Sequence, residues 1–114
     1  MSMLSDLINT LKSLNVPIET GVFTDKAPNE YIVLTPIDEY FLLFGDNAPL
    51  VDISSVRISL YTKGNYLSLK NSIVKALIND GYTLTNRQYI GYETETMYHH
   101  YNIDVENYYE TEEF

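Results

Sequence analysis

Two adjacent histidines, His99 and His100, are the only imidazole groups in the chain and the first candidates for acid–base or metal chemistry. They fall in a segment of alternating polarity, Met97 to Glu106, that predicts a β-strand. Neighbouring residues in a strand point to opposite faces, so the two rings cannot readily bind one metal ion. No cysteine is present to complete a zinc site. We therefore expect no metal site, with one histidine packed or hydrogen-bonded and the other exposed.

Two pairs of carboxylates could in principle carry general acid–base catalysis. Glu93 with Glu95, and Asp104 with Glu106, have the spacing that places both groups of a pair on one strand face. The same spacing is common on solvated strands, and nothing nearby indicates an apolar pocket that would separate the two pKa values. Ordinary surface carboxylates are the better interpretation.

Oxygen ligands also gather around one predicted turn, at Asp46, Asn47 and Asp52, but they lack the spacing of a calcium-binding loop. No serine lies in a nucleophile-elbow pattern. Neither of the common glycine-rich phosphate-binding motifs occurs. The sequence therefore predicts a protein that is not an enzyme and needs no cofactor.

The net charge of the chain limits the kinds of molecule that it can bind. Sixteen acidic residues face seven basic ones, which gives a formal charge of −9. The basic residues are scattered, and binding to phosphates requires them clustered, so we do not expect specific binding to DNA or to anionic membranes. An acidic wall past which DNA slides is compatible with this charge. No segment has the length of a membrane span, and the N-terminus does not resemble a signal peptide.

The elements that would position these groups follow from the periodicity of apolar residues. Leu4, Leu7, Ile8 and Leu11 recur at helical spacing, and strand-like segments are separated by turn-forming residues. We predict helices at Ser2–Leu14 and Tyr66–Asn79, the second ending at Asp80-Gly81, and strands at Ile18–Phe23, Tyr31–Leu34, Ile37–Phe44, Val51–Tyr61, Tyr89–Glu93 and Met97–Glu106.

These elements predict an α+β fold. Most strands are joined by short turns, which favours an antiparallel, possibly mixed, sheet with both helices packed on one face. We expect a single domain over residues 1–106, followed by an acidic C-terminal tail over residues 107–114.

Two polar, turn-rich segments are the most plausible binding surfaces, because binding residues often lie on loops held by a rigid sheet. One is the loop from Thr24 to Glu30, and the other is the break from Lys63 to Tyr66. Ordinary surface loops remain the alternative. The residues we assign to an oligomer or partner interface are Thr24, Asp25, Lys26, Asn29, Glu30, Lys63, Asn65 and Tyr66.

Several short segments, in their order and spacing, resemble a family of tail-terminator or tail-completion proteins of long-tailed bacteriophages. The similarity extends over about residues 4 to 106, and each segment is short. The segments are Val16-Pro17, Gly21-Val22-Phe23, Ala27 to Val33, Asp46-Asn47, Ile58 to Lys63, the second helix, and Tyr89-Ile90 with Glu93 and Met97-Tyr98.

The resemblance implies a sheet with helices on one side and a hexameric ring that caps the tail tube. It implies that the tail tube protein and a head connector are partners, that DNA passes through the ring without specific binding, and that there is neither catalysis nor a cofactor. The location implied is the head-proximal end of the virion tail, after assembly in the host cytoplasm.

Two other readings stay open. The chain could be a head-completion or connector protein of the same virion, which would share its small size and acidity. It could also be a small acidic regulator that binds a basic host protein, which would be absent from virions.

Overall fold

A computed structural model describes residues 3–20, 28–43 and 50–111 of the chain. Helix α1 (Met3–Leu11) continues into a short 3₁₀ helix, η1 (Lys12–Leu14). Strands β1 (Ile18–Thr20), β2 (Glu30–Leu43) and β3 (Leu50–Thr62) follow. Helix α2 (Tyr66–Asn79) precedes the hairpin of β4 (Thr83–Glu93) and β5 (Tyr98–Thr111).

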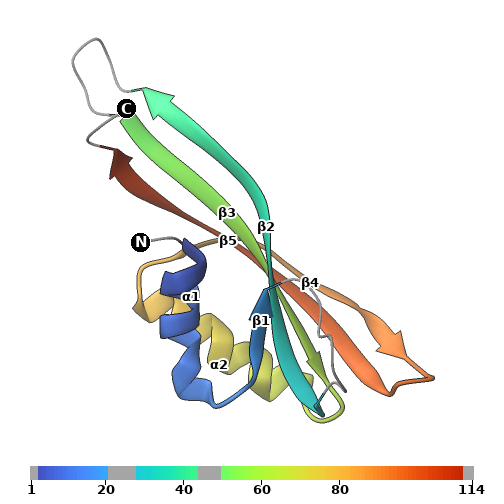
Figure 1. Cartoon of the computed structure of the whole chain (residues 1–114). Coiled ribbons are helices and arrows are strands. Elements are labelled where there is room, and N and C mark those ends of the chain that lie inside the picture. The colour runs from blue at the N-terminus through green and yellow to red at the C-terminus, as the bar shows by residue number, and fades with distance from the viewer. Residues whose placement is uncertain (1–2, 21–27, 44–49, 112–114) are drawn as a thin grey trace.

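The strands described by the structure form one five-stranded sheet in the order β1-β2-β3-β5-β4. The short edge strand β1 runs parallel to β2, and the other three pairs are antiparallel. The predicted mixed α+β fold is therefore confirmed. Both helices lie against one side of the sheet, as predicted (Figure 1). Among the described residues no helix covers the other side, which we call the open face.

The core lies between the two helices and this side of the sheet. Alternate residues of each central strand point into it, as the period of two requires. Its fully buried side chains come from all of these elements: Leu7 and Leu11 from α1, Ile73 and Leu77 from α2, Ile32 and Leu34 from β2, Ile58 and Leu60 from β3, and Ile103 and Val105 from β5.

Helix α2 begins and ends as its sequence predicts. The side-chain oxygen of Asn65 accepts hydrogen bonds from the backbone N–H groups of Leu67 and Ser68. At the other end Gly81 has a φ of +84°, its N–H donates to Ile78 O, and the N–H of Tyr82 donates to Leu77 O. This pair of bonds is a Schellman motif, which requires the left-handed conformation that glycine adopts easily.

Three boundaries differ from the prediction. Thr35-Pro36 does not separate two strands, because β2 continues through it with a register irregularity between Pro36 and Asp38. Such a bulge accommodates a proline that cannot donate to the ladder. Strand β4 begins at Thr83 rather than Tyr89. An acidic tail is predicted from Asn107, whereas β5 continues to Thr111 and pairs with β3 to its end.

Together these extensions build a three-stranded projection, which we call the arm: residues 37–43 of β2, 50–55 of β3 and 106–111 of β5. The arm reaches well beyond the helices (Figure 1). It gives the chain its elongated shape, 55 × 26 × 24 Å. No helix among the described residues is both long and apolar enough to cross a membrane.

Candidate interaction surfaces

The structure brings the two predicted interface segments together at one end of the sheet. The N–H of Lys63 donates to the carbonyl of Asn29 over 3.0 Å, and the Thr62 hydroxyl donates to the Glu30 carboxylate over 2.9 Å. Thr24, Asp25 and Lys26 lie outside the described residues. The remaining five residues thus share one end of the molecule, although they come from distant parts of the sequence.

Two of these five also hold the fold together. Asn65 is the N-cap of α2. Tyr66, which is half-buried, packs its ring 4.8 Å from that of Tyr89 and 5.1 Å from that of His99 on the helix side of the sheet. His99 also shares a 3.0 Å hydrogen bond between its Nδ1 atom and the Tyr89 hydroxyl.

A second aromatic cluster lies on the open face at the same end. Tyr31 stacks on Tyr61 with 4.7 Å between ring centroids, and Tyr61 stacks on His100 at 4.3 Å. Tyr98 meets Tyr31 edge-on at 5.5 Å and donates its hydroxyl hydrogen to the carbonyl of Pro28. Burial raises the pKa values of Tyr31 and Tyr61, so both phenols stay protonated at neutral pH.

His100 is held neutral inside this cluster. Burial lowers its pKa, a hydrogen bond with Asn102 and the nearby Glu93 act in the opposite direction, and Arg57 adds a weaker lowering. Its Nε2 atom is buried and meets no hydrogen-bond partner in the part of the chain that the structure describes. The prediction of one packed and one exposed histidine is therefore wrong in one respect, because both rings are partly buried.

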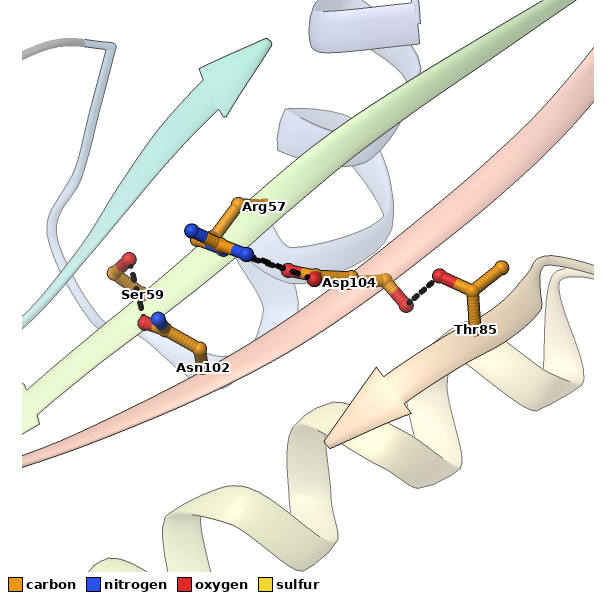
Figure 2. Close-up of polar contacts among 5 residues, drawn as sticks. All are labelled: Arg57, Ser59, Thr85, Asn102 and Asp104. Carbon is orange, nitrogen blue, oxygen red and sulfur yellow. Dashed lines mark hydrogen bonds and ion pairs between the residues drawn. The ribbon is translucent and has the colours of Figure 1, made fainter. Parts of the chain in front are cut away.

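A polar ladder follows on the open face, towards the arm (Figure 2). The Arg57 guanidinium binds the Asp104 carboxylate with two hydrogen bonds, 2.9 Å and 3.1 Å long. The neighbouring Ser59 hydroxyl donates to Asn102 over 2.9 Å. These contacts join directly paired positions of β3 and β5, and they place Asp104 in an ion pair rather than in a catalytic pair with Glu106.

The described residues offer no clear metal-binding or acid–base group elsewhere. No group of three or more histidine or acidic side chains there could hold a metal ion. The carboxylate pair Glu93 and Glu95 lies on exposed positions at the β4 end.

The arm is the surface that sequence reasoning missed. On its open face Asp38 and Glu106 flank Ser55 in one row of paired residues, and Tyr40 and Tyr108 flank Ile53 in another. Tyr40 and Tyr108 are 41% and 66% exposed. The signal was present in the sequence, because residues 37–55 and 106–114 hold eight of the sixteen acidic residues and none of the seven basic ones.

Comparison with solved structures gives matches to the fold of this chain. No family model and no curated protein matches the chain. Among solved structures, a chain from the "Virion of native gene transfer agent (GTA) particle" superposes with a TM-score of 0.51. The match covers 95% of this chain and 92% of that chain.

The two chains share a fold. Their sequences are only 9% identical, so the similarity concerns the arrangement of helices and strands and not the function of particular residues. It extends over almost the entire length of both chains, which means that the arm and the helix-covered sheet are parts of one common architecture.

Proposed function

We propose that this chain is a structural protein of a long-tailed, phage-like particle, in which it ends the tail tube and forms the tail side of the head–tail joint. The observation that supports this most is the near full-length match to a chain from a virion of a gene transfer agent. The resemblance of the sequence to tail-completion proteins points in the same direction independently of that match.

In this proposal several copies of the chain, most simply six, assemble into a ring. A ring needs contacts between two different surfaces of each copy, and this molecule offers at least two separate ones, the arm and the loop-bearing end of the sheet. The partners would be the tail tube protein on one side and a head connector on the other, with DNA passing through. A surface with a formal charge of −9 does not retain the DNA phosphates.

The residues Asn29, Glu30, Lys63, Asn65 and Tyr66, with Thr24, Asp25 and Lys26, stay our proposal for one of these contact surfaces. Replacement of Asn29, Glu30 and Lys63 by alanine should prevent joining of particles. The monomer should remain folded, because all three are exposed. Circular dichroism of the purified variant is the control for folding, and normal joining with all three replaced would exclude this surface.

The experiment that tests the function is electron microscopy of lysates from a phage or prophage with a stop codon in the gene for this chain. Full heads beside unjoined or overlong tails would support a tail-ending role. Heads that lose their DNA would indicate the head-completion role instead. Normally joined particles would contradict both and favour the acidic regulator.

A further inference from the structure

The arm is strongly acidic. Its residues, 37–43, 50–55 and 106–111, include five acidic side chains and no basic one. Two arms therefore repel each other, and symmetric pairing through the arms is disfavoured. A partner for the arm must present positive charge.

The outer surface of helix α2 is basic and partly apolar, which complements the acidic arm. From Tyr66 to Asn79 it contains two lysines and no acidic residue. Lys75 is exposed on the outer surface, whereas Lys70 is half-buried and its ammonium lies 5.9 Å from the centre of the Tyr101 ring. Its outer surface also exposes two large apolar side chains, Leu67 at 51% and Ile78 at 61%. Because the spacing 67, 71, 75, 78 follows one helical stripe, an apolar residue lies at each end of the stripe and Lys75 lies between them.

The open face of the arm matches this pattern. Its acidic row of Asp38 and Glu106 is adjacent to its apolar row of Tyr40, Ile53 and Tyr108. Within the arm the described residues include no lysine or arginine. Acidic and aromatic groups on one surface thus meet basic and aliphatic groups on the other, which gives both attraction and apolar burial.

We propose that the open face of the arm of one copy docks on the outer surface of α2 of a second copy. The contact joins two different surfaces, so it is head-to-tail, and it closes into a ring when the rotation between copies permits. This inference deepens the proposed function, since it names the surfaces through which the copies of the ring meet. It also explains why a chain with so large a net charge can associate with itself.

The test uses charge exchange in assembled particles. Lys75→Glu, and separately Asp38→Lys with Glu106→Lys, should each reduce the fraction of joined particles. A chain that carries all three changes should recover most of it, because the attraction is restored with reversed sign. The matched control is Glu39→Lys, whose row with Ser54 and Asn107 lies on the opposite face of the arm, and it should join particles normally.

A chemical readout makes the contact itself visible. The chain has no cysteine, so Asp38→Cys and Lys75→Cys can be purified separately, mixed and oxidised, and any mixed disulfide is necessarily between copies. We expect several-fold more of this dimer than from Glu39→Cys mixed with Lys75→Cys.

Normal joining with both the Lys75→Glu variant and the Asp38→Lys, Glu106→Lys variant would overturn the inference. So would no recovery in the folded chain that carries all three changes, or equal cross-linking at Asp38 and Glu39. The proposed function fails differently, since it fails when the stop codon leaves the particles normally joined.

Discussion

Arg57 and Asp104 form an ion pair on the open face, and the two side chains differ sharply in exposure. The side chain of Arg57 is 44% exposed and that of Asp104 only 11%. The pair matters chiefly because Asp104 would otherwise be a buried carboxylate without a cation. Removing the arginine therefore leaves the costly partner behind.

We expect Arg57→Ala to lower the free energy of unfolding by about 1–3 kcal/mol, as for hydrogen bonds to charged groups. Urea titration at neutral pH measures this. Arg87→Ala, at an exposed position of β4, is the control and should change stability by less than about 0.5 kcal/mol. Equal effects of the two substitutions would mean that Asp104 finds enough solvent or other donors without Arg57.

His100 makes the stability of the folded chain depend on pH. Its pKa in the folded chain is lowered by burial, whereas in the unfolded chain it is about 6.5. As the pH falls below about 6.5, the unfolded chain takes up a proton that the folded chain resists, so stability decreases on acidification. Above the pKa of the unfolded state the imidazole is neutral in both states, so it adds no dependence on pH there.

We expect His100→Phe to lose less stability than the wild type between about pH 7.5 and about pH 5.5, since phenylalanine keeps the stack on Tyr61 and does not titrate. Urea unfolding at the two pH values gives the comparison. A parallel loss in the two proteins would show that His100 is not the group responsible.

At the scale of elements, α2 depends on the geometry of its last turn. Gly81 has a positive φ and no atom would crowd a Cβ there, so a side chain would be strained by backbone conformation alone. We expect Gly81→Ala to destabilise the chain by about 1–2 kcal/mol. Thermal unfolding measures this effect.

Gly64 provides the matched control. It lies just before α2, its φ is not in the left-handed region, and the nearest atom to an added Cβ is 3.7 Å away. Gly64→Ala should therefore leave the melting temperature almost unchanged. A similar loss at both positions would contradict an origin in the left-handed conformation.

Helices and core strands were predictable because their signals are local. The apolar stripe from Leu4 to Leu11 and the alternation from Val56 to Tyr61 each repeat with one period. The length of β2 could not be predicted in this way. Judged from its neighbours in the sequence alone, Pro36 should end a strand, and β2 continues past it because the residues on both sides pair with β3. For the same reason residues 107–111 were assigned to a tail, because their partner strand is more than fifty positions away.

The spatial arrangement of the predicted interface residues could not be predicted from the sequence either, because it depends on contacts between distant segments. Their composition suggested loops, but only the fold reveals that Asn29 and Lys63 are hydrogen-bonded neighbours. The eleven tyrosines of the chain lie in different places in the structure. Most pack in the two aromatic clusters at one end of the sheet, and Tyr40 and Tyr108 are exposed on the arm.

The whole molecule divides into a body covered by helices and an arm that the helices do not cover (Figure 1). Elements with few tertiary contacts open locally more often than the core. We expect hydrogen-bonded amides of residues 51–55 and 107–111 to exchange faster than those of residues 56–62 and 101–105 in the same strands. Hydrogen exchange of the monomer at low concentration measures this gradient, and uniform protection along β3 and β5 would contradict it.

The continuity of β2, β3 and β5 from the body into the arm has a mechanical consequence. Inter-strand hydrogen bonds lie perpendicular to the strands, so a force directed along the arm acts on many of them at once and in shear. No hinge loop interrupts β3 or β5 at the junction. A force on the arm is therefore transmitted directly to the strands that pack beneath the helices. The molecule should resist extension best along its own long axis.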